Sequence, residues 1–446
     1  MSRYCHLALL LVALLLLTAC GGETATQPSP SAQPAATATT PPTPLPSVTP
    51  TSLPAPVVAA STATATPPPA TAIPSPTPLP PALATAMALA PAQPLPVGHP
   101  GYAESPCSDK YPCNEDVAGW EARLRVPDGF LARYYAYLPD TAPTSITFGP
   151  DGLLYVATLD GQIFTVDASG ESTLFFEGLI APTAITFQPG TWRLFVSDRV
   201  INVSNGGESQ ISVIENGERR QIIGGLPCCY AGMHAAQGIA FGPDGYAYAG
   251  VGARADHGEI LDSENLPDER RPLEAAIIRF SPDGSEVSEY AAGFRNPYDL
   301  AFDGNGQLYT TDNGPDFGPP DEFHIVVPGG EHGYPYYVCD DCFGIPAAVD
   351  LIPPAYEFPP HVSPTGLTTY LAAAFPGYYN SIFAVLWSAF EGAQKVVHFG
   401  PGGSGGTDFA QGFALPIDVT VGPDGNLYVA DFATGIVFQI SYVGEP

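Results

Sequence analysis

The sequence from Gly238 to Gly250, GIAFGPDGYAYAG, contains the unit that decides the fold. Two runs of alternating apolar residues flank a Gly-Pro-Asp-Gly turn. This arrangement predicts a β-hairpin, because glycine readily adopts the positive φ of a tight turn. Two close copies share the turn: Ser145 to Ala157 (SITFGPDGLLYVA) and Asp418 to Ala430 (DVTVGPDGNLYVA).

Looser copies of this hairpin bring the set to six. They run from Ala184 to Ser197, from Asp299 to Thr311 and, less regularly, from Gly366 to Trp387. A spacing of about 40 residues or more between such units is typical of propeller blades, so we predict an all-β fold, a six-bladed β-propeller. A large β-sandwich is the less favoured alternative, because Greek-key strands do not require so regular a repeat.

Closure of the ring needs a strand from each end of the chain. A strand candidate from Leu131 to Leu138 precedes the first hairpin, and another from Ile436 to Ile440 follows the last. We expect the two to pair in one blade, since that pairing leaves no free sheet edge.

The N-terminal residues carry an export signal. Arg3 precedes an apolar run from Leu7 to Leu17 that is too short for a comfortable membrane span, and the run ends in Leu-Thr-Ala-Cys-Gly. This ending resembles the bacterial lipobox, which implies a lipoprotein signal peptide over residues 1–20 and a lipid on Cys20 that attaches the chain to the membrane. An ordinary secretory signal is the alternative.

Composition divides the remaining chain. Residues 21–100 are rich in Pro, Thr and Ala with almost no charge, so we expect a disordered linker that acts as a stalk. A short Cys-containing lead-in follows at 101–120, and the propeller occupies 121–446. We therefore expect an extracytoplasmic location, lipid-anchored to the cell membrane or cell surface.

The chain is strongly acidic, with 15 Lys+Arg against 45 Asp+Glu and a formal net charge of -30. Nucleic acid is excluded as a partner, because binding to phosphates depends on basic side chains. Because an exported chain forms disulfides, we expect them within the close pairs Cys107/Cys113 and Cys339/Cys342. Cys228 and Cys229 either form a vicinal ring or pair elsewhere, and the sequence leaves this open.

The stretch from Gly293 to Pro335 combines three kinds of chemistry. It contains Gly-Phe-Arg-Asn-Pro, then Asn-Gly-Pro, then the acidic pair Asp321-Glu322, then Pro-Gly-Gly-Glu-His-Gly-Tyr-Pro. The arginine can bind anions, while the turn carbonyls and the two carboxylates suit a hard cation such as calcium.

This ordered set, together with His234 to Gly245 and Ala276 to Gly284, resembles the soluble glucose/sorbosone dehydrogenase family, whose members bind pyrroloquinoline quinone (PQQ) on a six-bladed propeller. The resemblance covers about Val126 to Tyr442. It implies a PQQ-dependent dehydrogenase for an aldose or a sorbosone-type sugar, with Ca²⁺ as a second cofactor. Its electrons would pass to an external acceptor such as a cytochrome, a copper protein or a quinone.

The resemblance also implies roles for individual residues. His234 would be the catalytic base that takes the proton of the sugar hydroxyl, and Arg295 would stabilise negative charge on the cofactor. Asn296 would be a neighbouring hydrogen-bond donor to the cofactor. The implied metal-binding residues are Gly314, Pro315, Asp321, Glu322 and Tyr334.

The last blade departs from the family pattern. It carries Asp431-Phe432-Ala433-Thr434 where relatives active on glucose supply arginines to the cofactor carboxylates, and Arg254 stands where a glutamine is expected. Because PQQ carries several carboxylates, cations must come from elsewhere. We expect Arg254 and Lys395 to bind the cofactor, and Arg199 is a further candidate.

Two alternatives come from other functional classes. A cofactor-free surface propeller that binds carbohydrate or protein is favoured by the missing arginines and the long linker. A calcium-dependent, lactonase-like hydrolase would need inward-facing Glu, Asn and Asp residues from several blades, and the sequence contains no clear set of this kind.

Overall fold

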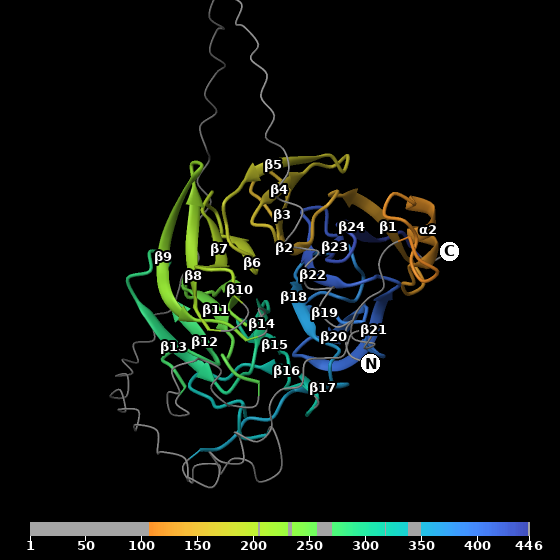
Figure 1. Cartoon of the computed structure of the whole chain (residues 1–446). Coiled ribbons are helices and arrows are strands. Elements are labelled where there is room, and N and C mark those ends of the chain that lie inside the picture. Colours follow the sequence, from red (N-terminus) through yellow and green to blue (C-terminus); the bar gives the residue numbers. More distant parts are fainter. Residues whose placement is uncertain are drawn as a thin grey trace, which may run out of the picture. The chain divides into compact units, whose positions relative to one another are not determined.

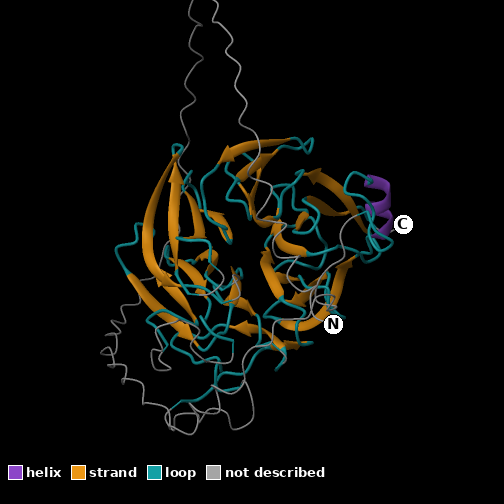
Figure 2. Cartoon of the chain, viewed as in Figure 1, coloured by secondary structure: helices purple, strands orange, loops and turns teal. Residues whose placement is uncertain are grey.

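The structure is a computed structural model that describes residues 107–203, 206–230, 234–256, 270–316, 318–337 and 349–444. The expected signal peptide with Cys20, the whole expected linker and residues 101–106 of the lead-in lie outside the described residues, as do Cys339 and Cys342. Strands make up nearly all of the regular structure in the described residues, which contain a single helix (Figure 2). The predicted all-β class is therefore confirmed.

The strands form six four-stranded antiparallel sheets, arranged as blades around a common axis (Figure 1). The strands of the first three blades are given from the axis outward. Blade 1 contains β2 (Pro143–Phe148), β3 (Leu154–Thr158), β4 (Ile163–Val166) and β5 (Ser172–Phe176). Blade 2 contains β6 (Ala184–Phe187), β7 (Leu194–Arg199), β8 (Glu208–Glu215) and β9 (Glu218–Pro227). Blade 3 contains β10 (Ala236–Phe241), β11 (Ala247–Val251), β12 (Ala276–Phe280) and β13 (Val287–Ala292).

The other three blades complete the six-bladed propeller that the sequence predicts. Blade 4 contains β14 (Pro297–Phe302), β15 (Leu308–Asp312), β16 (Asp321–Ile325) and β17 (Tyr356–Phe358). Blade 5 contains β18 (Pro364–Tyr370), β19 (Ser381–Leu386), β20 (Lys395–Gly400) and β21 (Ser404–Gln411). Blade 6 contains β22 (Pro416–Val421), β23 (Leu427–Asp431), β24 (Ile436–Tyr442) and, outermost, β1 (Phe130–Tyr137).

Each predicted hairpin is the pair of innermost strands of one blade. In the hairpin of blade 3 the turn residue Gly245 has a φ of +82°, and its N–H donates to the carbonyl of Gly242. A residue with a side chain is disfavoured at such a φ. The Gly-Pro-Asp-Gly sequence therefore sets the turn, and the turn sets the register of the two strands.

The two ends of the chain close the ring in blade 6. The first strand, β1, pairs antiparallel with the last strand, β24, from Phe130↔Tyr442 to Tyr137↔Ile436. This confirms the expected pairing. Hydrophobic side chains of blades 5 and 6 pack between these strands and their neighbours, so closure also buries apolar surface.

A short helix, α2 (Val117–Arg123), lies in the lead-in and packs against blade 6. Asp116 caps its first turn by accepting the N–H of Gly119. Trp120 is fully buried, lies 5.9 Å from the ring of Phe438 in β24, and donates from Nε1 to the carbonyl of Cys113. Among the described residues no helix is long and apolar enough to span a bilayer.

Two disulfides occur in the described residues. Cys107 is bonded to Cys113 in the lead-in, as the sequence predicts. Cys228 and Cys229 are bonded to each other, which resolves the alternative that the sequence left open. Both residues of the second pair are fully buried beside Ala235.

A β-bulge occurs at the start of the inner strand in five of the six blades. One extra residue lies between Pro143 and Ser145, Ala236 and Ile239, Pro297 and Asp299, Pro364 and Leu367, and Pro416 and Asp418. Bulges change the direction of side chains and are common beside binding sites. Because every inner strand begins at the same end of the propeller, the bulged residues form a ring around the axis at that end.

An aspartate at or near the end of the second strand recurs in three blades. Asp198, Asp312 and Asp431 each accept backbone N–H groups from the loop that leads into the inner strand of the same blade. The donors are Ile180 in blade 2, Arg295 and Asn296 in blade 4, and Ala414 and Leu415 in blade 6. Each carboxylate therefore fixes the loop at the start of its blade.

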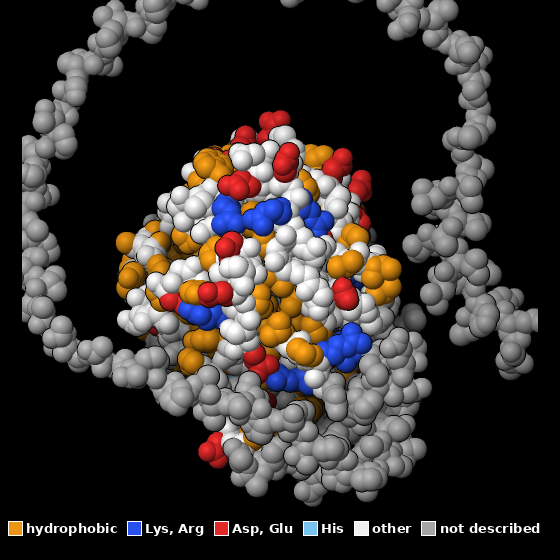
Figure 3. Space-filling view, turned by 90° about the vertical axis from the view of Figure 1, so that its left-hand side faces the viewer, with side chains coloured by type: hydrophobic (Ala, Val, Ile, Leu, Met, Phe, Trp, Pro, Cys, Tyr) orange, Lys and Arg blue, Asp and Glu red, His pale blue; other side chains and the backbone are white. Residues whose placement is uncertain are grey.

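Basic and acidic side chains lie side by side over the outer strands of blades 2 and 3 (Figure 3). Three arginines of these blades make ion pairs: Arg193 with Glu215, Arg219 with Asp198, and Arg279 with Asp244. A surface whose basic groups are paired in this way does not favour phosphate binding.

We predict that Phe438→Ala lowers the free energy of unfolding by about 3–5 kcal/mol, because it opens a cavity between α2, β1 and β24. Denaturant unfolding of the purified protein measures this change. Leu174→Ala on β5, where the side chain is 46% exposed, is the control and should have little effect. Equal stability of the two variants would contradict the closing role of this contact.

Candidate active site

The candidate site lies at the end of the propeller where inner strands begin and second strands end. His234 immediately precedes blade 3, and Arg295 and Asn296 immediately precede β14 of blade 4. Arg254 follows the end of β11, and Gly314 follows the end of β15. The antiparallel hairpins therefore bring these sequence-predicted residues to one end of two adjacent blades.

His234 is buried and held in one tautomer. Its Nδ1 lies 2.7 Å from the carbonyl oxygen of Ala253. A carbonyl can only accept a hydrogen bond, so Nδ1 carries the proton and Nε2 of the neutral ring carries the lone pair. Burial, with a contribution from Arg295, lowers the pKa of His234 to about 3. The imidazole is therefore neutral at physiological pH and can accept a proton at Nε2.

Arg295 is buried in an ion pair. Its Nη2 lies 2.7 Å from Oδ1 of Asp256, its Nε donates to the same oxygen, and its Nη1 donates to the carbonyl of Asn313. Burial alone would lower the pKa of Arg295, but the Asp256 carboxylate more than offsets this, so the net pKa is raised. The guanidinium also lies 5.6 Å from the ring centroid of Tyr230, whose ring contacts His234.

Asn296 connects blades 3 and 4. Its Oδ1 accepts a hydrogen bond of 2.9 Å from Nε2 of Gln237, which lies in the bulge of blade 3. Its backbone N–H donates to Oδ1 of Asp312, while the N–H of Arg295 donates to Oδ2. The position of the Arg-Asn pair is thus set by one carboxylate.

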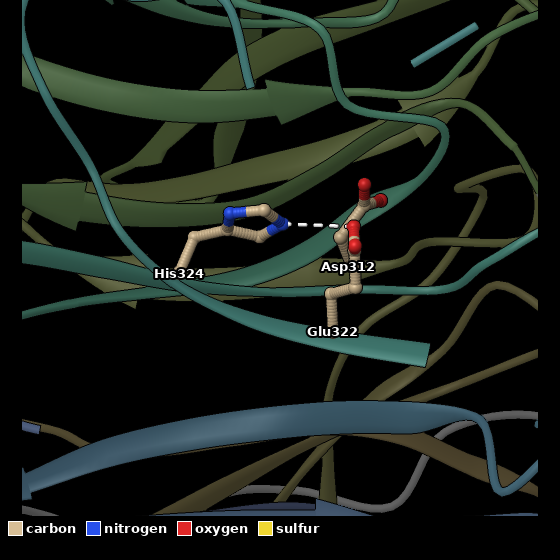
Figure 4. A group of neighbouring side chains, drawn as sticks. All are labelled: Asp312, Glu322 and His324. Atoms are coloured by element: carbon tan, nitrogen blue, oxygen red, sulfur yellow. Dashed lines mark hydrogen bonds and ion pairs between the residues drawn. The ribbon is translucent and has the colours of Figure 1, made fainter. Parts of the chain in front are cut away.

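Asp312 also belongs to a buried cluster with Glu322 and His324 (Figure 4). Their ligand-type atoms lie within 4.8 Å of one another. Nε2 of His324 lies 3.0 Å from Oε2 of Glu322, and burial raises the pKa of Asp312 to about 7. Two carboxyl groups so close together in a buried site favour a bound proton or a cation.

The histidines of this cluster form a directed chain of hydrogen bonds. The N–H of Val327 donates to Nε2 of His332, so the proton of that neutral ring is on Nδ1. Nδ1 of His332 lies 3.2 Å from Nδ1 of His324, which must therefore accept. His324 then carries its proton on Nε2 and donates it to Glu322. Both nitrogens of His324 are used, and the cluster presents carboxylate oxygens to a cation.

The acidic pair that the sequence predicts as metal ligands is divided. Asp321 and Glu322 are adjacent in β16, so their side chains point to opposite faces of the blade. Both oxygens of Asp321 accept backbone N–H groups, from Gly314 and from Ser363. Glu322, in contrast, faces Asp312 and His324.

The other predicted metal-binding residues have local partners. The carbonyl of Pro315 accepts the N–H of Gly318, at 3.3 Å. The hydroxyl of Tyr334 donates to the carbonyl of Ala255, which places this ring beside the Asp256 loop. The structure therefore brings Tyr334 near Arg295 but not into the Asp312 cluster.

The two cations expected to bind the cofactor differ in position. Arg254 is buried at the candidate site, where its Nε lies 3.2 Å from Oε2 of Glu274. Lys395 lies in β20, the third strand of blade 5, and pairs with Asp408 of β21. It lines a surface hollow there together with Arg123 of the lead-in. The structure thus does not bring Lys395 to the other predicted residues.

Sequence reasoning missed three contributors to the site: Asp256, Asp312 and His324. Asp256 lies in a loop just past β11, and no turn or strand pattern marks its contact with Arg295. Asp312 could have been found, since an aspartate at or next to the end of the second strand recurs at Asp198 and Asp431. His324 stands two residues after Glu322 in a strand, a spacing that places both side chains on one face.

Solved structures of sugar dehydrogenases share this fold. The PQQ-bound aldose sugar dehydrogenase of Streptomyces coelicolor is 20% identical, with a TM-score of 0.53 over 71% of this chain and 99% of that one. The soluble aldose sugar dehydrogenase of Escherichia coli, in its apo form, is 17% identical, with a TM-score of 0.57 over 70% and 99% of the two chains.

Curated relatives match at low identity. An uncharacterized protein of Borreliella burgdorferi is 24% identical over 278 residues, which cover 58% of this chain and 71% of the relative. The HIPL2 protein of Arabidopsis thaliana is 28% identical over 181 residues, 33% of this chain and 25% of the relative. The profile described as "Glucose / Sorbosone dehydrogenase" matches residues 214–437, half of the chain. This range includes His234 and the whole stretch from Gly293 to Pro335, and the protein belongs to the glucose/sorbosone dehydrogenase family.

Proposed function

We propose that the protein is an extracytoplasmic, PQQ-dependent dehydrogenase of an aldose or sorbosone-type sugar. The observation that carries this proposal is the buried, neutral His234, whose Nδ1 is held by the Ala253 carbonyl and whose Nε2 is left as a base. Membership of the family supports a sugar dehydrogenase in general. The PQQ-bound relative from Streptomyces coelicolor supports the cofactor.

His234 would act as the general base. Oxidation of a sugar hydroxyl requires removal of its proton as hydride leaves the carbon, and Nε2 is the atom of His234 able to take that proton. The carbonyl of Ala253 then stabilises the imidazolium through Nδ1–H. PQQ, when bound, supplies the hydride acceptor.

The described residues fit this cofactor in part. PQQ carries several carboxylates, and Arg295, Arg254 and Arg199 lie at the end of the propeller where His234 lies. The first two already pair with Asp256 and Glu274, so their charges are balanced within the protein. Arg295 would hold the cofactor through hydrogen bonds, and Asn296 would be a neighbouring hydrogen-bond donor. Arg254 would be a further cofactor-binding residue at the same end of the propeller.

Asp312 and Glu322 would hold the calcium ion. Both carboxylates are buried close together, so a cation between them would offset their mutual repulsion. The nitrogens of His324 are engaged with His332 and Glu322, which leaves oxygen donors of the kind that Ca²⁺ prefers. Asp321 is not part of this cluster, because its side chain points to the opposite face of β16.

The proposed membrane attachment and electron acceptor rest on the sequence alone. A lipid on Cys20 would attach the protein to the membrane, and the linker would hold the propeller away from it. Electrons would leave through an external acceptor, namely a cytochrome, a copper protein or a quinone. A sugar substrate at an extracytoplasmic site is consistent with these features.

A second candidate function has one observation in its favour. Arg254 and Arg295 are both paired with carboxylates, and the last blade has Asp431 and Phe432 where arginines are expected. A propeller with its cations already balanced suits a cofactor-free module that binds carbohydrate or protein at the surface. Failure to bind PQQ would favour this function.

We predict that the purified protein, supplied with Ca²⁺ and PQQ, reduces a dye acceptor with at least one sugar of an aldose panel. His234→Ala should lower kcat by about 10²- to 10⁴-fold, because it removes the base, while the Kd for PQQ stays unchanged. His398→Gln in β20 of blade 5, remote from the site, is the control. A protein that neither retains PQQ nor reduces the dye is not this dehydrogenase.

The pH dependence of the reaction should lack a limb near the ordinary histidine pKa. Because burial lowers the pKa of His234 to about 3, the base stays neutral between pH 8 and about 5, and loss of kcat/KM from its protonation begins only below this range. Measurement of kcat/KM between pH 4 and 8 checks this. A decline with an apparent pKa between 6 and 7 would show that the base is a more solvated group.

Calcium should raise the unfolding temperature, and Zn²⁺ should not, because the nitrogens of His324 are already hydrogen-bonded. A cation at about 100 times its Kd stabilises the folded state by about 2.7 kcal/mol. Glu322→Gln should abolish the calcium effect, whereas Glu218→Gln on the exposed edge of β9 should retain it. An equal or larger effect of Zn²⁺ would contradict the assignment of an oxygen-only site.

A further inference from the structure

Three buried polar atoms at the candidate-site end of the propeller have no hydrogen-bond partner among the described residues. They are Oγ1 of Thr144, Oγ1 of Thr365 and Nε1 of Trp387. Burial of an unpaired polar group costs about 1–3 kcal/mol, so such atoms indicate a missing partner. An indole N–H can only donate, and each threonine hydroxyl can donate as well. The missing partner is therefore rich in acceptors.

These atoms come from the same end of two blades, blade 1 and blade 5. Thr144 and Thr365 lie in the bulges that begin the inner strands of blades 1 and 5. Trp387 directly follows β19, and its ring lies 5.9 Å from that of Phe432, which directly follows β23 of blade 6. The bulged threonines and the residue that follows β19 thus lie at the end of the propeller where a pair of aromatic rings also lies.

A cation lies at the same end of the propeller in blade 2. Arg199 is the last residue of β7 and is buried, with Nη1 at 3.4 Å from Oδ1 of Asn202. Its charge acts on Tyr298, the bulged residue of blade 4, and burial lowers the pKa of Arg199. Blades 2 and 4 are separated by blade 3, so residues of the two can approach only near the axis.

Two carboxyl groups also lie near the axis, Asp299 of blade 4 and Asp418 of blade 6. Asp299 accepts the N–H groups of Leu300 and Leu367, and Asp418 accepts those of Ile146 and Val419. Burial and the nearby carboxyl group of Asp418 raise the pKa of Asp299. Their oxygens accept hydrogen bonds from these backbone donors.

We propose that Arg199, Thr144, Thr365 and Trp387 form an axial anion subsite that takes a carboxylate of the quinone cofactor. Arg199 supplies the positive charge, and the threonines and the indole supply neutral hydrogen-bond donors. This arrangement replaces the arginines that the last blade lacks. The inference rests on the proposed function for the identity of the ligand, although the subsite itself requires only a carboxylate.

The test is isothermal titration of the full-length chain with PQQ and, separately, with benzene-1,3,5-tricarboxylate, which has carboxylates but no quinone. Arg199→Gln, Trp387→Phe and Thr144→Val should each raise the Kd for both ligands by about tenfold or more, the usual effect of removing a hydrogen bond to a charged group. Unfolding temperatures and circular dichroism establish that each variant is folded.

Matched controls use exposed residues away from the axis. Arg220→Gln lies in β9 of the same blade as Arg199, and Trp192→Phe changes a side chain that is 58% exposed. Both should bind the two ligands as the wild type does. If the wild type and the three axial variants bind PQQ equally well, the subsite inference is wrong and the proposed function stands.

The two ligands separate the subsite from the dehydrogenase proposal. Binding of the tricarboxylate that is lost in the axial variants, without binding of PQQ, would support the subsite and overturn the proposed function. Absence of binding of either ligand to the wild type would overturn both. Loss of PQQ binding in the controls as well as in the axial variants would show a general effect of substitution and would contradict the subsite.

Discussion

The candidate site depends on the hydrogen bonds that Asp312 accepts from the backbone N–H groups of Arg295 and Asn296. A buried carboxylate is stable only where donors surround it, so the two N–H groups and the carboxylate hold one another in place. Asp198 and Asp431 make the same kind of contact in other blades. The site is thus a variation on a feature of the fold: blade 4 adds an arginine to the loop and two further titratable groups beside the aspartate.

The buried arginines of the candidate site are paired for the same reason, namely that a buried charge needs a partner. In a chain with a net charge of -30, the two buried arginines of blades 3 and 4 each have a carboxylate within about hydrogen-bonding distance. Such pairing keeps each guanidinium rigid and ionised, and it removes most of its net charge. At this end of the propeller the two arginines therefore offer hydrogen-bond donors in fixed directions but little net positive charge.

Local signals in the sequence predicted the fold well. Gly-Pro-Asp-Gly turns between alternating runs identified the inner hairpins, and unpaired strands at the two ends identified the closing blade. The order of strands in these hairpins also places His234, Arg295 and Asn296 at one end of the propeller. The sequence did not predict contacts made by loops, such as the ion pair of Arg295 with Asp256, which follows β11. The position predicted for Lys395 was wrong because its strand, β20, is the third strand of blade 5.

Closure of the propeller requires both ends of the folded chain, because β1 pairs with β24. Since β1 cannot pair until β24 exists, the ring remains open, with an unprotected sheet edge, until the last residues have been synthesised. Pairings so far apart in sequence form slowly. The closed ring therefore appears only once β24 is available to pair with β1, late in the synthesis of the chain and not at its start.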